Sequence, residues 1–75
     1  MNFTDKIALV TGGGNGIGRA SALLFAEHGA AVVVVDKDAV AAADTARLIT
    51  EQGGDALDVA ADVSGSDQVQ AYVVA

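Results

Sequence analysis

The chain has 75 residues, neither cysteine nor proline, and a formal net charge of −6. This length allows one small domain at most, and the lack of cysteine excludes a disulfide framework and a Cys-based zinc site. Ten acidic residues against four basic ones argue against nucleic-acid or anionic-membrane partners, and a hydrophobic fraction of 52% argues against disorder. No targeting segment or bilayer-spanning run stands out, so a cytoplasmic setting is expected.

Three apolar segments predict β-strands. Ile7–Val10 and Ala31–Val35 are unbroken apolar runs, which are typical of strands covered on both faces in a parallel sheet. Ala56–Asp62 is the expected third strand, and Asp58 interrupts its apolar pattern. The interruption favours a place at the edge of the sheet for this strand.

The segments between and after these strands predict helices. Helix-forming residues fill Ile17–His28 and about Ala39–Gln52, and glycine follows each segment as a natural stop. Ser64, with Asp67 three residues later, indicates an approximate capping box at the start of a third helix that carries Tyr72. The chain is expected to end inside this helix.

The order of elements predicts an α/β fold. Right-handed crossovers between parallel strands would place helices on both faces of the sheet. The expected architecture is the N-terminal β-α-β-α-β half of a doubly wound parallel (Rossmann) sheet, truncated in its third helix. The whole chain, 1–75, is then one partial nucleotide-binding domain.

A glycine-rich turn lies between the first strand and the first helix. Five glycines occur in the seven residues from Gly12 to Gly18. Glycine allows a tight turn and close backbone approach to a ligand, and the free N–H groups at a helix start favour a phosphate. A tight turn without a ligand needs fewer glycines, so a phosphate-bearing ligand is the favoured interpretation.

The spacing of the glycines separates several nucleotide-binding classes. A strict G-x-G-x-x-G is absent, and a Walker A loop would need Lys and Ser or Thr where Arg19 and Ala20 stand. Gly14-x-Gly16-x-Gly18 is similar to the first motif of S-adenosylmethionine-dependent methyltransferases, although Gly12 occupies the position of their usual acidic residue. A methyltransferase-like or non-catalytic nucleotide-binding module therefore remains the alternative.

Thr11-Gly12-x-x-x-Gly16-Ile17-Gly18 resembles the coenzyme signature of the short-chain dehydrogenase/reductase family. Asp36 at the end of the second strand and Asp62-Val63 at the end of the third strand agree with the layout of that family. The resemblance covers essentially the whole chain. It implies an NAD(P)-dependent oxidoreductase that transfers a hydride between a nicotinamide coenzyme and an alcohol or ketone.

The resemblance also implies roles for the residues of the turn. Thr11 braces the turn through its hydroxyl, and Gly12 makes the turn tight. Gly16 allows close approach to the pyrophosphate, with backbone N–H groups near Asn15 and Ile17 as donors. Gly18 lets the helix pack on the sheet.

The residues after the second and third strands are expected to contact the adenosine. Asp62 would accept a hydrogen bond from the adenine amino group beside the Val63 backbone; capping the next helix is an equally open role for Asp62. Asp36 would accept hydrogen bonds from both ribose hydroxyls and repel a 2′-phosphate, which favours NAD over NADP. Lys37 is interpreted as a solvated turn residue, and Asn15 lacks the positive charge common in NADP-preferring members.

The residues that catalyse hydride transfer in this family are missing from the chain. The family uses a tyrosine, a lysine four residues later and a serine, and Tyr72 has no fourth residue after it. We therefore expect an enzyme only in a longer parent protein, itself a homo-oligomer, and no catalytic or metal site here. In the family's strand order the fourth strand falls beyond Ala75, which would leave Ile7–Val10 as an open edge and promote unfolding or self-association of the isolated chain.

Overall fold

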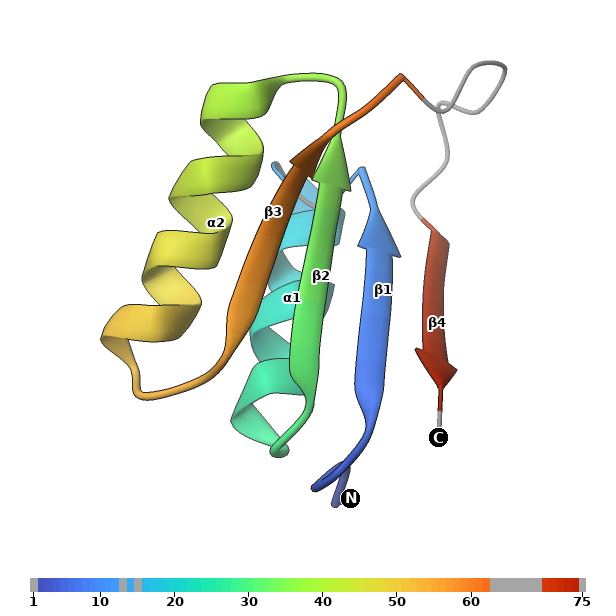
Figure 1. The fold of residues 1–75 in the computed structure, drawn as a ribbon, viewed down its shortest axis with the longest axis vertical. Helices are drawn as coiled ribbons and strands as arrows, with labels where there is room; N and C mark the ends of the chain where they lie inside the picture. The colour runs from blue at the N-terminus through green and yellow to red at the C-terminus, as the bar shows by residue number, and fades with distance from the viewer. Residues whose placement is uncertain (1, 13, 15, 63–69, 75) are drawn as a thin grey trace.

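The computed structural model describes residues 2–12, 14, 16–62 and 70–74 of the chain. Within these residues, four strands form one sheet in the order β3-β2-β1-β4, and two helices pack on it (Figure 1). The elements are β1 (Ile7–Thr11), α1 (Gly16–Glu27), β2 (Ala31–Asp36), α2 (Ala39–Glu51), β3 (Ala56–Ala60) and β4 (Gln70–Val74). The first three predicted strands and both full predicted helices are confirmed, with small shifts at their ends.

The strands β1, β2 and β3 are parallel neighbours. Val10 of β1 pairs with Val34 of β2, and Val34 pairs in turn with Asp58 of β3. The strand β3 lies at the edge of the sheet and Asp58 is exposed, as the interrupted apolar pattern predicted. None of the helices in the described ranges is long and apolar enough to cross a membrane.

The last described segment differs from its prediction. Residues 70–74 form β4, which pairs antiparallel with β1, so the expected third helix is wrong here. Ser64 lies outside the described residues. Tyr72 lies opposite Leu9 in the sheet rather than on a helix, and β1 is paired on both sides rather than open. Tyrosine and valine favour strands, and the free edge of β1 offers them backbone partners.

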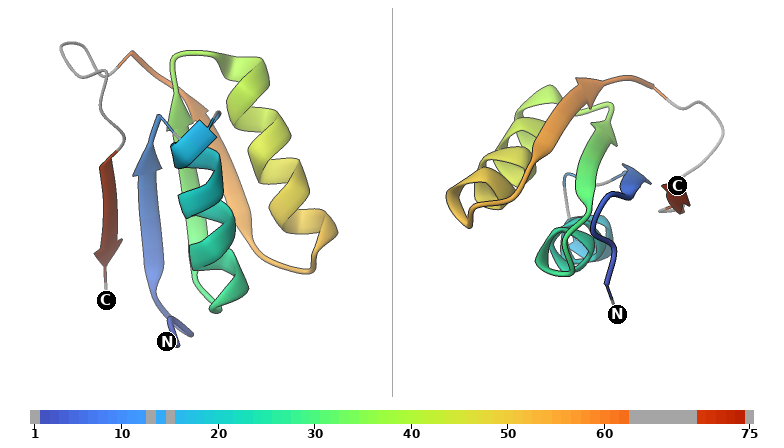
Figure 2. Two further views of the ribbon diagram at one scale, coloured as in Figure 1. Left: turned by 180° about the vertical axis from the view of Figure 1, so that it is seen from behind. Right: turned by 60° about the horizontal axis from the view of Figure 1, so that its bottom comes forward.

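Both helices lie on the same face of the sheet (Figure 2), so the expectation of helices on both faces is wrong for the described residues. The two crossovers step in one direction, from β1 to β2 to β3, and the same handedness places both helices on one side. Small apolar side chains let helices and sheet approach closely. The buried cluster consists of Ala8, Val10, Ala22, Ala30, Val32, Val34, Ala42 and Ile49.

In the described part of the chain no helix covers the opposite face of the sheet, called the open face below (Figure 2). One row across the four strands contains Tyr72, Leu9, Val33 and Leu57. The open face also includes Ile7, Val35, Val59 and Val74, by the alternation of side chains along each strand.

The helix ends that position the loops have identifiable caps. Gly29 follows α1 with φ 98°, and Ala30 N–H donates to the Phe25 carbonyl at 3.1 Å in a Schellman-type ending. Asp38 caps the start of α2, where its carboxylate accepts from the N–H groups of Val40 and Ala41. These caps fix where α1 leads into β2 and where β2 leads into α2.

Candidate functional site

The carboxyl ends of the three parallel strands lie side by side at one end of the sheet (Figure 1). This end is called the sheet edge below, and it is distinct from the outermost strands β3 and β4. Thr11 pairs with Val35, and Asp36 pairs with Ala60. Beyond β3, the N–H of Ala61 donates to the Asp36 carbonyl at 3.0 Å, which keeps the approach to Asp62 beside the end of β2. Open α/β sheets bind ligands outside this edge, so the structure gathers Thr11, Asp36 and Asp62 where a ligand is expected.

The turn from β1 to α1 reaches this edge as well. Gly12 and Gly16 have φ values of 66° and 54°, in the left-handed region that favours glycine. A Cβ at Gly16 would have no atom within 4 Å, so conformation rather than space favours glycine there. Gly18 is buried, whereas Ile17 is 77% exposed. The helix α1 thus starts with its N–H groups at the candidate site.

Asp36 holds the turn through its carboxylate. Oδ2 accepts from the Gly14 N–H at 2.9 Å, and Oδ1 accepts from the Asp38 N–H at 3.0 Å. An ionised carboxylate has about four acceptor positions, so two hydrogen bonds leave it capacity for a ligand. Lys37 is exposed, in keeping with a solvated turn residue.

Gly14 lies in a close-packed position between β2 and α2. A Cβ built on it would lie 2.6 Å from the Ala41 Cβ and 2.8 Å from Oδ2 of Asp36. The residue is buried, and both of its backbone polar groups are hydrogen-bonded, to Asp36 and to Arg19. The glycine pattern includes Gly14, but sequence reasoning gave it no separate role.

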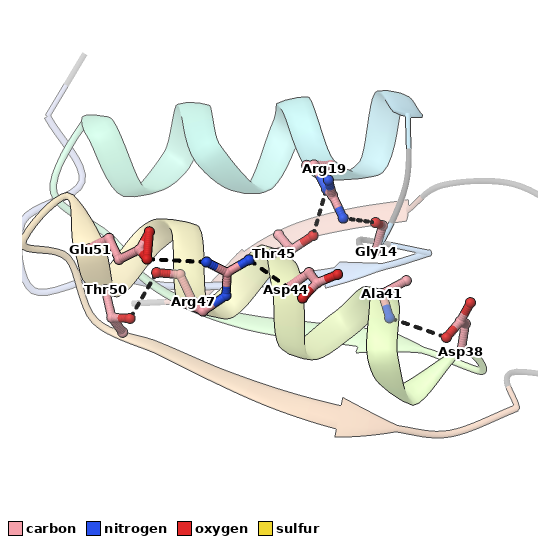
Figure 3. A network of polar contacts seen from close by, with 9 residues as sticks. All are labelled: Gly14, Arg19, Asp38, Ala41, Asp44, Thr45, Arg47, Thr50 and Glu51. Carbon is pink, nitrogen blue, oxygen red and sulfur yellow. Dashed lines mark hydrogen bonds and ion pairs between the residues drawn. The ribbon is translucent and has the colours of Figure 1, made fainter.

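From the sequence, Arg19 in the first turn of the first helix is expected to be a surface residue that points outward. In the structure it points toward α2, so that expectation is wrong (Figure 3). Its Nη2 donates to the Gly14 carbonyl at 2.8 Å, and its Nε donates to Oγ1 of Thr45 at 3.0 Å. Thr45 is fully buried in α2. A threonine 26 residues further along the chain gives no sequence signal that it will meet this arginine.

The remaining predicted residues are placed as follows. Asp62 is exposed just beyond β3, and Asn15 and Val63 lie outside the described residues. No group of three potential metal ligands occurs in the part of the chain that the structure describes. The described geometry gathers a glycine turn, a helix N-terminus and a carboxylate at one sheet edge, which suits a ligand with phosphate and hydroxyl groups.

Comparison with known proteins identifies the group to which this architecture corresponds. The family model described as "short chain dehydrogenase" matches residues 6–75. Levodione reductase from Leifsonia aquatica is 44% identical over 75 residues, which cover 97% of this chain and 28% of that protein.

Two solved structures combine sequence and structural similarity with a bound coenzyme. A 7 alpha-hydroxysteroid dehydrogenase complexed with NADH and 7-oxo glycochenodeoxycholic acid has a TM-score of 0.80 and 41% identity, over 81% of this chain and 24% of that one. A metagenomic short-chain oxidoreductase in complex with NADP has a TM-score of 0.80 and 37% identity, over 87% of this chain and 29% of that one. The chain spans less than a third of each of these three proteins.

Proposed function

Because the chain belongs to the short-chain dehydrogenase family, we propose that residues 1–75 are the coenzyme-binding part of a longer NAD(P)-dependent oxidoreductase. This enzyme, the full-length protein below, transfers a hydride between the nicotinamide and an alcohol or ketone. The observation that supports the proposal best is the meeting of the glycine turn and Asp36 at the carboxyl edge of the parallel strands. Family membership favours this function over the methyltransferase-like alternative.

The turn binds the pyrophosphate of the coenzyme in this proposal. Gly12 and Gly16 adopt the left-handed conformations that bring the backbone close to the ligand, with N–H groups near Asn15 and Ile17 as donors. Thr11 braces the turn, and the burial of Gly18 is consistent with close packing of α1 on the sheet. Asp62 and the Val63 backbone receive the adenine.

Asp36 selects NAD over NADP in this proposal. Its carboxylate ends β2 at the edge where the adenosine ribose is expected, and its two hydrogen bonds to backbone N–H groups fix its orientation. Remaining acceptor positions on the oxygens suit the two ribose hydroxyls, and the negative charge repels a 2′-phosphate. Relatives with NADH and with NADP both exist, so charge at this position is the feature that argues for NAD.

We assign no catalytic role to residues 1–75. Hydride transfer requires a proton donor and acceptor at the carbonyl oxygen, and the proposal places the tyrosine, lysine and serine that do this in the rest of the full-length protein. The full-length protein is proposed to be a cytoplasmic homo-oligomer that takes a small-molecule alcohol or ketone.

The first experiment replaces Asp36 by alanine in the full-length protein. We expect the ratio of kcat/KM with NAD to kcat/KM with NADP to fall about 10- to 100-fold, since a charged hydrogen-bond acceptor and a repulsive charge are both lost. Asp58→Ala, at an exposed carboxylate on β3, is the matched control and leaves the ratio unchanged. An unchanged ratio in Asp36→Ala removes Asp36 from the selective role.

The second experiment tests whether the ligand binds at the turn. Gly16→Val places a β-branched side chain where the pyrophosphate approaches, so calorimetry is expected to detect no coenzyme binding. Gly53→Val is the matched control, because Gly53 also has a positive φ, 88°, and open space around its Cβ position. Gly53 follows the C-terminal end of α2, at the opposite end of that helix from the candidate site. Equal binding in both variants contradicts a site on this turn.

A further inference from the structure

Arg19 connects the glycine turn, α1 and α2 (Figure 3). It belongs to the first turn of α1, and its guanidinium bonds the Gly14 carbonyl in the glycine turn and the Thr45 hydroxyl in α2. The planar guanidinium presents several donors in a fixed fork, so the two hydrogen bonds orient each other. The position of the turn is thereby tied to the position of α2.

Gly14 is held from both sides. Its N–H donates to Asp36, and its carbonyl accepts from Arg19 at 2.8 Å, a length typical of a charge-assisted hydrogen bond. The absence of room for a Cβ adds a steric limit from Ala41. A continuous set of contacts therefore runs from the end of β2 through the glycine turn and α1 to α2.

The Thr45 hydroxyl orients the Arg19 guanidinium. Thr45 is fully buried, and no buried side-chain oxygen or nitrogen in the described ranges lacks a hydrogen-bond partner. Its Oγ1 accepts a hydrogen bond from Nε of Arg19 at 3.0 Å. This bond directs the guanidinium toward α2, with Nη2 pointing at the Gly14 carbonyl. Arg19 thus links Thr45, buried in α2, to a turn residue 31 positions earlier in the chain.

We propose that Arg19 and Thr45 are positioning residues for the coenzyme: they hold the glycine turn in its binding shape without touching the coenzyme. The proposal rests on the proposed function of the turn. The competing role for Arg19 is direct attraction of a coenzyme phosphate by its charge. The two roles differ for lysine, which keeps the charge but lacks the fork, and for Thr45, which carries no charge.

The test measures the dissociation constant for NADH by fluorescence in the full-length protein, together with kcat and KM. Arg19→Lys and Thr45→Val are each expected to raise the dissociation constant and the coenzyme KM about tenfold, with kcat within twofold. The double variant is expected to be no weaker than the worse single variant, because both substitutions break one set of contacts. Thr45→Ser keeps the hydroxyl and is expected to restore wild-type affinity.

Two matched controls separate this effect from general changes in α2. Arg47→Lys alters an exposed arginine that pairs with Asp44 and Glu51, and Thr50→Val removes an exposed hydroxyl that bonds the Arg47 carbonyl. Both are expected to bind NADH as the wild type does. Urea unfolding of each variant identifies any that are not folded.

Each outcome decides the matter. Wild-type affinity in Thr45→Val overturns the proposal, and wild-type affinity in Arg19→Lys overturns it even if Thr45→Val does not fold. Purely additive losses in the double variant also overturn it. If the wild type and these variants bind NADH equally well, the positioning role of Arg19 and Thr45 is overturned and the proposed function stands. If the wild type binds no dinucleotide, the positioning role and the proposed function are both overturned.

Discussion

The two faces of the sheet share their strands but differ in what covers them. On the helix-covered face, Val10 and Val34 are fully buried under α1 and α2. On the open face, Leu57 is 60% exposed and Tyr72 is 49% exposed. Strands of a parallel sheet are normally covered on both faces. The buried core of the described residues therefore lies on the helix-covered face, which also holds the contacts that shape the glycine turn.

The sharpest test of this difference shortens one side chain of equal size to alanine on each face of the sheet. Ile49→Ala removes a fully buried side chain of α2 and is expected to lower the unfolding free energy of the 75-residue chain by about 2–5 kcal/mol. A domain of this size has only about 3–5 kcal/mol in total, so this variant is expected to be largely unfolded. Leu57→Ala on the open face is expected to change the free energy by less than about 1 kcal/mol. Urea unfolding followed by circular dichroism measures both, and equal losses would contradict the comparison.

A second test asks whether the glycine turn is part of the helix-covered packing. Gly14→Ala forces a Cβ against Ala41 and is expected to lower the unfolding free energy by about 1–3 kcal/mol. Ala41→Gly removes the atom that the new Cβ meets at 2.6 Å. The double variant is therefore expected to lose less stability than the sum of the two single variants. Strict additivity by urea unfolding would show that the turn and α2 are not packed together.

The open face is expected to make the isolated 75-residue chain self-associate. Leu57→Lys puts a charge into the apolar row across the strands, so the association constant measured by sedimentation is expected to fall about tenfold. Val40→Lys is the control, because Val40 is 71% exposed on α2, away from the open face. An isolated chain that is monomeric with or without these substitutions would contradict the prediction.

The smallest expected effect concerns the start of the covering helix α2. The Asp38 carboxylate accepts hydrogen bonds from the N–H groups of Val40 and Ala41, both at 3.1 Å. Asp38→Ala is expected to lower the unfolding free energy by about 1 kcal/mol, whereas Asp38→Asn keeps an accepting oxygen and most of the stability. Thermal unfolding gives the ranking. A loss as large as that of Ile49→Ala would mean that Asp38 has a role beyond capping.

Much of the fold was predictable because its signals are local. Unbroken apolar runs indicated β1 and β2, Gly29 indicated the end of α1, and Asp58 indicated that β3 is an edge strand. The segment 70–74 was not, because five residues are too few to separate a helical period from a strand. Its pairing with β1 depends on a partner some sixty positions away, which no local pattern reveals.

The candidate site divides in the same way. The glycine pattern and Asp36 were visible because they follow strands directly, and parallel strands bring their carboxyl ends together. The role of Arg19 was not visible in the sequence, because an arginine in the first turn of a helix has the same local signature whether it faces solvent or a neighbouring helix. Thr45 decides between these directions, and only the packing of α1 against α2 brings it near.

The place of β1 between β2 and β4 has a consequence for the chain as it is synthesised. Among the four described strands, β1 leaves the ribosome before the others and finds one partner in β2 soon afterwards, but its other partner emerges only with Gln70–Val74. Until then, a nascent chain that has already paired β1 with β2 presents an unsatisfied backbone edge to its surroundings. The time during which residues 37–69 emerge from the ribosome is therefore the interval in which chaperones or neighbouring nascent chains have access to that edge.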